Sequence, residues 1–190
     1  MGMAFTLVIN PGSSSKKYAL YREGACIFTA RFERINNEYG RTITVNGEQQ
    51  KREDVDAHLY RTALQSVIAS LREARLITSV ADIATVGVRV VAPGDRFAQH
   101  VAVTPDYLKD LVAAEPVAPL HVPPVREEVQ ATQSLLPHAK LIAVSDSAFH
   151  QTIPTYRRQY SVREAEAFGI RKFGYHGLSV ASVMRQCAEL

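Results

Sequence analysis

Hydrophobic and polar positions in the first third of the chain follow the patterns of β-strands. Residues 4–9 (AFTLVI) form a short apolar run, typical of a buried strand. Residues 17–22 (KYALYR) alternate, and residues 25–32 (ACIFTARF) also favour a strand. Asn46-Gly47 in "TITVNGEQQ" is a strong hairpin signal. The pattern predicts that two or three antiparallel strands open the chain and that a hairpin follows them.

Helical periodicity begins after this hairpin. Residues 54–75 predict one amphipathic helix, with Asp54 or Asp56 as its N-cap. Its apolar residues share one face, and they are Leu59, Ala63, Val67, Ile68 and Leu71. This face is expected to pack against a sheet.

The rest of the chain alternates between predicted strands and helices. We expect strands at 83–91 and 140–145, and helices at 105–114, 124–136, 163–168 and 177–190. This order is typical of an α/β domain whose sheet is covered by helices. The last helix reaches Leu190 without a C-cap glycine or a polar tail. We therefore expect the chain to be cut rather than finished at this point.

Composition narrows the protein class. With 190 residues, 46% hydrophobic and 22% charged, the chain can bury a sizeable core and suits one generous domain, or one domain and part of another. The net charge of +3 is spread along the chain, and the densest basic cluster is "YRRQY" at 156–160, so no nucleic-acid partner is expected.

Cysteine usage and hydropathy predict the compartment. Cys26 and Cys187 do not form a CxxC motif. The sequence neither excludes nor requires a single disulfide between them, and a reducing compartment is the default expectation. The N-terminus has no signal-peptide pattern, and no apolar run approaches 18 residues. We expect a soluble, cytoplasmic protein without a membrane partner.

The stretch "INPGSSSKKYALY" (9–21) interrupts the first two strands with a turn rich in glycine and serine. Such a turn can offer backbone N–H groups and hydroxyls to a phosphate, while Lys16 or Lys17 adds positive charge and Asn10 an amide. It is not a Walker P-loop, because the GxxxxGK[ST] spacing is absent and a strand follows it. A tight serine-rich hairpin without a ligand is an equally good interpretation.

Two later clusters carry candidate anion-binding residues. Arg89 lies in the apolar strand "VGVRVV", where it needs an anionic partner or a water-filled cleft, unless it reaches solvent from the strand end. His121 in "APLHVPP" lies among prolines that stiffen its loop. A structural role for this histidine remains open.

Two further clusters carry candidate catalytic residues. Asp146 in "LIAVSDSAFHQTIP" follows a buried strand, where α/β enzymes commonly place catalytic groups, although it could be a helix or turn cap. His150 follows four residues later, and His176 lies in "GIRKFGYHGLS". The spacing does not support zinc, and a Ser-His-Asp hydrolase lacks its GxSxG motif.

Taken together, the clusters resemble the acetokinase (acetate and propionate kinase) family of the sugar kinase–Hsp70–actin superfamily. "VINPGSSSKK" is similar to its first signature, "GIRKFGYHGLS" to its second, and "DSAFHQTIP" to its Asp-Thr-Ala-Phe-His-Gln-Thr stretch. The resemblance covers nearly the whole chain as the N-terminal half of such an enzyme. It implies a ribonuclease H-like α/β domain over residues 1–190, with a mixed sheet and flanking helices.

For the first hairpin, the resemblance implies a phosphate loop that binds ATP. The residues that would contact ATP or its phosphates are Gly12, Ser13, Ser14, Ser15 and Lys17. Asn10 would lie near Mg²⁺. The implied cofactors are thus ATP or ADP with Mg²⁺.

For the later clusters, the resemblance implies the site where a phosphoryl group is transferred to a carboxylate. Arg89 would hold the substrate carboxylate, Asp146 matches the acidic catalytic residue, and His121 and His176 would stabilise the transferring phosphoryl group. The pocket for the acyl tail would be lined by Val91, Leu120 and Tyr175. The implied reaction is ATP + acetate giving ADP + acetyl phosphate, in either direction, with acetate or propionate as the carboxylate.

The chain departs from the family in its length. Family enzymes are about twice as long as these 190 residues, and a C-terminal domain binds the adenosine moiety. We therefore expect this half alone to be inactive. A full-length relative is expected to be a homodimer, or this chain to pair with a missing C-terminal half.

The chain also departs from the family's motifs. Apolar residues replace polar ones around the site, and we interpret all of these changes as a less polar lining: Val88, Ala92, Val122, Val125, Leu178 and Val180. These changes leave open a second interpretation, in which the chain is a non-catalytic ligand-binding or partner-binding module.

The two interpretations share one geometric expectation. Asn10, Arg89, His121 and His176 should surround one cleft at the sheet edge, and the Gly12–Ser15 turn should face it.

Overall fold

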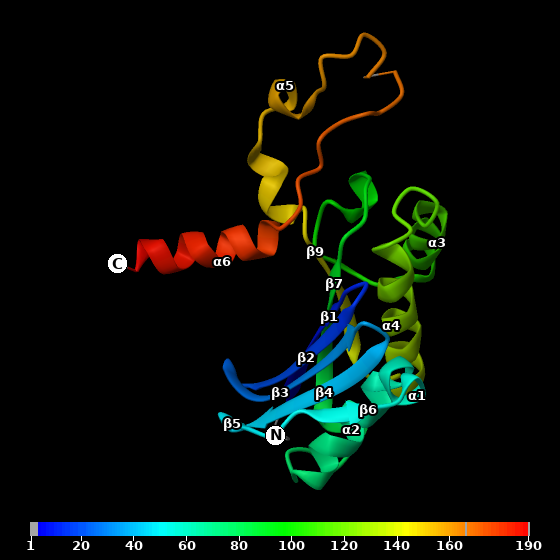
Figure 1. Ribbon diagram of the computed structural model, residues 1–190. Coiled ribbons are helices and arrows are strands. Elements are labelled where there is room, and N and C mark those ends of the chain that lie inside the picture. Colours follow the sequence, from blue (N-terminus) through cyan, green and yellow to red (C-terminus); the bar gives the residue numbers. More distant parts are fainter. Residues whose placement is uncertain (1–3, 166, 190) are drawn as a thin grey trace.

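The computed structural model describes residues 4–165 and 167–189, which form a nine-stranded mixed sheet with helices (Figure 1). The strand order is β5-β4-β3-β2-β1-β7-β9-β8, and β6 also pairs with β4. β7 lies parallel to both β1 and β9, whereas the other pairs are antiparallel. The carboxyl ends of β1, β7 and β9 therefore meet at one edge of the sheet.

The elements have the following bounds. The strands are β1 (Phe5–Pro11), β2 (Ser15–Arg22), β3 (Ala25–Ile35), β4 (Glu38–Val45), β5 (Glu48–Gln49), β6 (Glu53–Val55), β7 (Ile83–Val90), β8 (Val101–Ala102) and β9 (Lys140–Ser145). The α-helices are α1 (Ala57–Arg61), α2 (Ala63–Glu73), α3 (Pro105–Ala114), α4 (Val122–Leu135), α5 (Thr155–Arg158) and α6 (Gly177–Ala188). The 3₁₀ helices are η1 (Val80–Asp82), η2 (Asp95–Phe97) and η3 (Ala148–Thr152).

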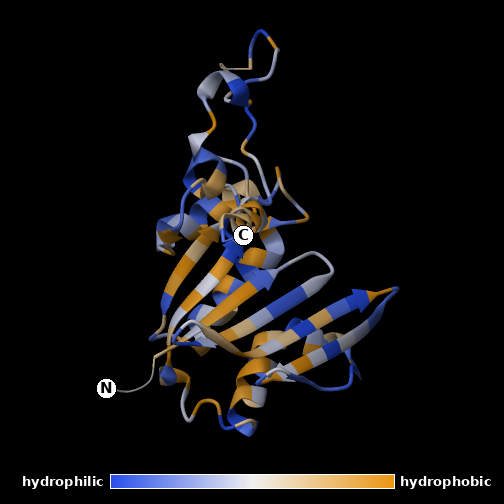
Figure 2. Ribbon diagram, turned by 90° about the vertical axis from the view of Figure 1, so that its left-hand side faces the viewer, coloured by the Kyte–Doolittle hydropathy of each residue, from blue (hydrophilic) through white to orange (hydrophobic). Residues whose placement is uncertain are grey.

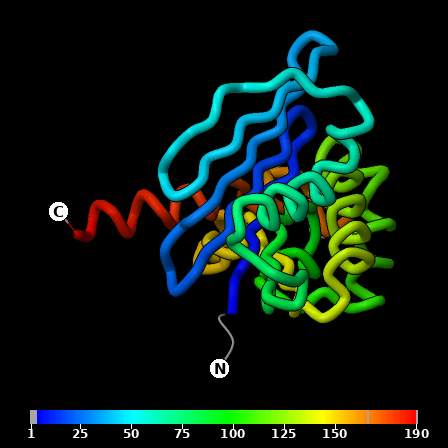
Figure 3. Tube along the Cα trace, turned by 90° about the horizontal axis from the view of Figure 1, so that it is seen from below, coloured from blue at the N-terminus to red at the C-terminus, as the bar shows by residue number. Residues whose placement is uncertain are grey.

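Alternating strand residues build the core between the sheet and α1–α4. Residues on the inward face of neighbouring strands are almost completely buried, among them Leu7, Ile9, Leu20, Phe32, Val86 and Val88. Figure 2 shows the same alternation of hydrophilic and hydrophobic residues along the strands. The opposite face is more open, and Val8 on β1 remains 38% exposed. Seen from below, α1–α4 cover one side of the sheet, and α6 points away on the other (Figure 3).

The strand predictions are confirmed, with small shifts at the ends. The hairpin at Asn46-Gly47 is confirmed as well, since it joins β4 to β5 and both residues have positive φ, 50° and 88°. The helix predicted at 105–114 is confirmed as α3, and the apolar face of α2 is buried as expected. The α/β fold class is thus correct.

The single helix predicted at 54–75 is wrong. Residues 53–55 form β6, which pairs with β4 at the sheet edge, and the helical segment is interrupted at Thr62 between α1 and α2. Asp56, not Asp54, is the N-cap, and its Oδ1 accepts a hydrogen bond from the Leu59 N–H at 2.7 Å. Strand pairing is a tertiary contact that helical periodicity does not reveal.

Two of the helix predictions for the last third need correction. The short helix expected at 163–168 is wrong, because the described residues there form turns; Glu166 lies outside the described residues. So short a segment forms a stable helix only when packing supports it. The helix expected at 124–136 begins earlier, at Val122, with both prolines in its first turn and His121 as its N-cap. The final helix is confirmed as α6 up to Ala188, and Leu190 is not among the described residues.

No helix among the described residues combines the length and the apolar character needed to cross a membrane.

Candidate functional site

Three strands bring distant residues together at their carboxyl ends. Asn10 lies near the end of β1, Arg89 is the penultimate residue of β7, and Asp146 directly follows β9. The parallel registers Ile9 with Val88 and Arg89 with Val144 place these side chains side by side. Sheets of this type commonly bind ligands at this edge.

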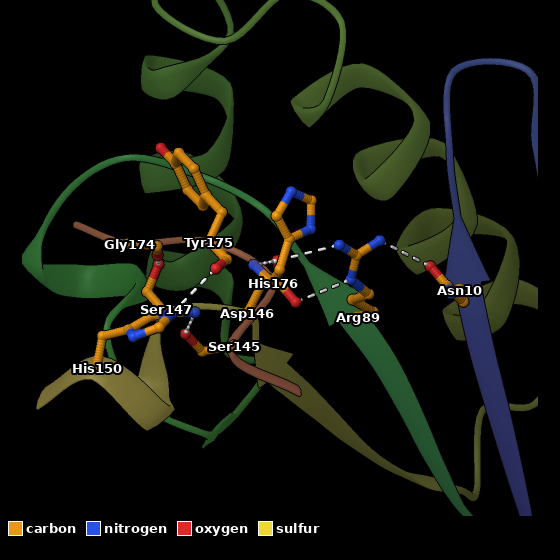
Figure 4. Close-up of polar contacts among 9 residues, drawn as sticks. All are labelled: Asn10, Arg89, Ser145, Asp146, Ser147, His150, Gly174, Tyr175 and His176. Carbon is orange, nitrogen blue, oxygen red and sulfur yellow. Dashed lines mark hydrogen bonds and ion pairs between the residues drawn. The ribbon is translucent and has the colours of Figure 1, made fainter. Parts of the chain in front are cut away.

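Arg89 is held between two oxygen-bearing side chains (Figure 4). Its Nε and Nη2 donate to Asp146 Oδ1 and Oδ2 at 3.1 and 3.0 Å, a bidentate ion pair. Its Nη1 donates to Asn10 Oδ1 at 3.1 Å. The Arg89 side chain is 26% exposed, so its remaining edge still reaches solvent.

Asp146 is buried and fully engaged. In addition to Arg89, the backbone N–H of His176 donates to its Oδ2 at 2.6 Å. Burial alone would raise the pKa of Asp146, but the hydrogen bonds from Arg89 and His176, together with the positive charge of Arg89, hold it below its usual value. Asp146 is therefore an ionised anchor at neutral pH.

The turn at residues 174–177 is held against the end of β9. Ser147 Oγ donates to the Gly174 carbonyl at 2.6 Å. The Nε2 of His150 lies 3.0 Å from the Tyr175 carbonyl; since that oxygen only accepts, Nε2 carries the proton. His176 has a left-handed backbone with φ 61°, and the contacts of its neighbours fix this conformation.

Glycine is required at both ends of this turn. Gly174 has φ 72°, and a Cβ there would lie 2.6 Å from the His150 ring. A Cβ on Gly177 would lie 2.4 Å from the Asp146 carbonyl, which accepts the Gly177 N–H at 2.9 Å. The segment "YHG" (175–177) thus packs its backbone directly against the end of β9, with no room for an additional Cβ at Gly177.

A cavity of about 350 Å³ lies at this edge. It is lined by Pro11, Gly12, Ser13, Ser14, Ser15, Arg89, Val91, His121, Val125, Tyr175 and His176. The expectation of one shared cleft is therefore confirmed for Arg89, His121, His176 and the Gly12–Ser15 turn, but Asn10, which was also expected there, does not line the cavity. The Gly12 N–H donates within the turn to the Ser15 carbonyl at 2.8 Å, so the exposed Ser13 and Ser14 are the groups that offer donors to the cavity.

Some predicted residues lie elsewhere. Leu120 is 68% exposed in the connection between α3 and α4 and does not line the cavity. Lys17 is exposed on β2 beside Asn10. Asn10 and Asp146 do not line the cavity, but both contact Arg89, which does.

The apolar replacements do not all change the lining, which corrects the interpretation from sequence. Only Val125 contributes to the cavity wall. The side chains of Val88, Ala92 and Val122 are buried, with Val88 and Val122 fully enclosed in the core between sheet and helices. Val180 is 38% exposed on α6.

Sequence reasoning assigned no role to Ser147 and left His150 without one. Both support the turn that carries Tyr175 and His176. The only signal was their closeness to Asp146 in "SDSAFH", and the contacts across about 25 residues come from the fold alone.

The residues present do not form a magnesium site by themselves. Within residues 4–165 and 167–189, no group of three or more His, Cys, Asp or Glu side chains is arranged to hold a metal ion. Asn10 Oδ1, the expected ligand, accepts a hydrogen bond from the Arg89 cation.

Comparison with known proteins gives a consistent result. Residues 5–190 match the model of the acetokinase family. The chain is 37% identical over 193 aligned positions to an acetate kinase of Bacillus mycoides (strain KBAB4), covering 99% of this chain and 48% of the relative. It is 38% identical to acetate kinase 2 of Listeria monocytogenes serotype 4b, with the same coverage. The chain thus spans about half the length of the curated relatives that it matches.

Solved structures agree with this result. A propionate kinase from Francisella tularensis superposes with a TM-score of 0.84 at 30% identity, covering 98% of this chain and 49% of that one. Porphyromonas gingivalis acetate kinase superposes with a TM-score of 0.82 at 29% identity, with the same coverage. The fold is therefore that of the acetate and propionate kinases.

Proposed function

The chain belongs to the acetokinase family, and we propose that it supplies the carboxylate- and phosphate-binding side of an ATP-dependent acyl kinase. The observation that carries this proposal is the cavity in which Arg89, His121, His176 and the Gly12–Ser15 turn meet. One guanidinium, two imidazoles and a serine-rich turn around one hollow favour an anionic ligand.

Arg89 is proposed to bind the substrate carboxylate. Among the described residues, its contacts to Asp146 and Asn10 use three of the five N–H groups of a guanidinium, which leaves two for an anion in the cavity. Val91 and Val125 provide apolar wall for a short acyl tail. Acetate or propionate has the required chemistry: a planar anion with one or two carbons behind it.

The serine turn and the histidines are proposed to bind the phosphoryl group. A carboxylate oxygen held by Arg89 would attack the γ-phosphorus of ATP, and the bond from that phosphorus to the β-phosphate bridging oxygen would break to release ADP. Positioned donors stabilise the charge on the transferring group, and Ser13, Ser14, His121 and His176 are the donors available here. Lys17 and Asn10 remain predicted contacts to ATP and to Mg²⁺.

Asp146 is proposed to act as a positioning residue. Both of its oxygens accept N–H groups that line or adjoin the cavity, those of Arg89 and of the His176 backbone. It thereby orients the guanidinium and the YHG turn before a ligand arrives. Its assignment as an acidic catalytic group stays a prediction.

One observation favours the second candidate, a non-catalytic binding module. The bidentate edge of Arg89 already faces Asp146, so a substrate carboxylate meets a partly neutralised arginine. Such a pocket could hold an anion without transferring it.

Anion binding by the chain itself tests the proposed function. Acetate and inorganic phosphate are titrated separately into the ¹⁵N-labelled chain while its amide resonances are recorded. We expect saturable shifts at Ser13, Ser14 and His176 with both anions, and none with chloride at equal ionic strength. If neither anion moves these resonances, the cavity is not an acyl-kinase site.

A further inference from the structure

A buried ion pair adjoins the Gly12–Ser15 turn in sequence. Lys16 Nζ is 2.8 Å from Glu128 Oε1, and the two side chains are only 6% and 3% exposed. Lys16 occupies the first inward-facing position of β2, ahead of the core residues Tyr18 and Leu20. Its ammonium also lies 5.5 Å from the centroid of the Tyr60 ring. A lysine in this position is unusual, since the inward face is otherwise apolar.

The pair joins two walls of the cavity. Lys16 directly follows Ser15, the last residue of the serine turn. Glu128 lies on α4 seven residues after His121 and three after Val125, both of which line the cavity. Residues with this spacing share one face of a helix. The ion pair is thus the direct charged link between the phosphate turn and the helix that carries His121.

Stability does not account for the pair. Burying two charges costs solvation free energy, and their mutual attraction offsets this cost only when their other polar atoms are hydrogen-bonded as well. A protein with an apolar pair of equal volume at such a site is commonly as stable. Here, among the described residues, Glu128 Oε2 and the nearby buried Tyr18 hydroxyl have no hydrogen-bond partner of good geometry, and only the close approach of these two groups to each other compensates for their burial. Burial, and next the Glu128 charge, raise the pKa of Tyr18 well above its usual value, so this hydroxyl stays neutral.

We propose that Lys16 and Glu128 form a positioning pair that sets the Gly12–Ser15 turn at a defined place relative to the start of α4. The inference rests on the proposed function, because it gives the pair a part in shaping the anion cavity. A short ionic contact specifies one arrangement, whereas apolar side chains can pack in several. Lys16 therefore contributes to phosphate binding without touching the phosphate.

The test replaces the pair by apolar residues of similar volume, Lys16→Met with Glu128→Leu, in the full chain. The control is Arg126→Met with Glu115→Leu, which removes an ion pair of the same helix that does not reach the turn. Three quantities are measured: the Tm, the hydrogen-exchange protection of the Gly12 amide in the ligand-free chain, and the Kd for inorganic phosphate. Gly12 reports on the turn because its N–H donates to Ser15.

We expect the Lys16→Met/Glu128→Leu variant to keep its Tm, lose about tenfold in Gly12 protection and bind phosphate about tenfold more weakly. The control should change neither protection nor Kd. Unchanged Gly12 protection in the test variant overturns the inference, as does unchanged phosphate affinity where the parent chain binds phosphate. A parent chain that binds no phosphate contradicts the proposed function, and Gly12 protection then decides the positioning role alone.

Discussion

The guanidinium of Arg89 is the central group of the candidate site, because it contacts both Asp146 and Asn10. Arg89 contacts Asp146 through two donors and Asn10 through a third, so its orientation is set before any ligand arrives. Preorganisation of this kind lowers the entropy lost on binding. The same contacts give Arg89, which lines the cavity, and Asp146, which holds it in place, a role in the stability of the fold as well.

Replacing Arg89 by alanine should remove the carboxylate anchor. A hydrogen bond to a charged group contributes about 1.5–3 kcal/mol, so acetate binding should weaken about 10- to 100-fold. Arg31→Ala is the matched control, because Arg31 is exposed on β3 and pairs with Glu33. The Kd for acetate from resonance shifts is the measurement. An Arg89→Ala chain that stays folded and binds acetate normally would show that this arginine is only structural.

Asp146 should make the stability of the chain depend on acidic pH. Its folded pKa lies below the unfolded value of about 3.9, so its contribution is present above about pH 4 and is lost as the pH falls through the folded pKa. Asp146→Asn should lower stability at neutral pH by about 3 kcal/mol, the low end for breaking a buried pair, because Arg89 still reaches solvent.

Thermal melts from about pH 2.5 to 7 check this prediction. The difference in Tm between the parent chain and Asp146→Asn should shrink toward the acidic end. A difference that is constant over the whole range would mean that the charge of Asp146 contributes nothing.

The turn at residues 174–177, directly before α6, places Tyr175 and His176 at the cavity. It contains two glycines whose positions leave no room for a Cβ, it accepts hydrogen bonds from Ser147 and His150, and its His176 N–H donates to Asp146. Because the helix begins directly at this turn, any shift in its approach to β9 moves the His176 imidazole as well.

Gly177→Ala should disturb this approach. The new Cβ would lie 2.4 Å from the Asp146 carbonyl, and backbone must move to relieve the contact. We expect a loss of about 1–3 kcal/mol in the free energy of unfolding, measured by urea denaturation, together with weaker phosphate binding. Ser179→Ala, exposed in the same helical turn, serves as the control and should have little effect. A Gly177→Ala chain as stable as the parent would show that the close approach is unnecessary.

The whole chain covers about half of its relatives, and the cavity lies at the edge of its sheet. α6 points away from the sheet on the side opposite α1–α4 (Figure 3). Its apolar side chains remain largely exposed there, among them Val183 at 56% and Met184 at 59%. Under the proposed function, we expect this cavity to receive the carboxylate and the γ-phosphate end of a nucleotide.

We expect the chain of residues 1–190 to show no acetate-dependent formation of acetyl phosphate from ATP above background. The physical reason is that positioned donors on one side only do not fix a nucleotide in line with the carboxylate. Trapping of acetyl phosphate with hydroxylamine measures the product. Robust turnover by a preparation free of contaminating kinase would refute the expectation.

The sequence by itself determined the α/β class, most of the strands, α3 and the positions of the candidate residues. Alternation and short apolar runs are local signals, and inward-facing residues such as Leu7 and Val86 can be recognised from them. The convergence of Arg89, His121 and His176 on one cleft also followed from sequence, through the family resemblance of the motifs that carry them.

Only the tertiary structure decided which partners these residues have. Pairing of β6 with β4 replaced the first residues of a helix that periodicity predicts, and the exposed connection before α4 kept Leu120 out of the cavity. Lys16 and Glu128 lie more than one hundred residues apart in the sequence, and no local pattern in either segment predicts their contact. Hydrophobic periodicity encodes which face of an element is buried, but the choice of contact across the core depends on how all elements pack together.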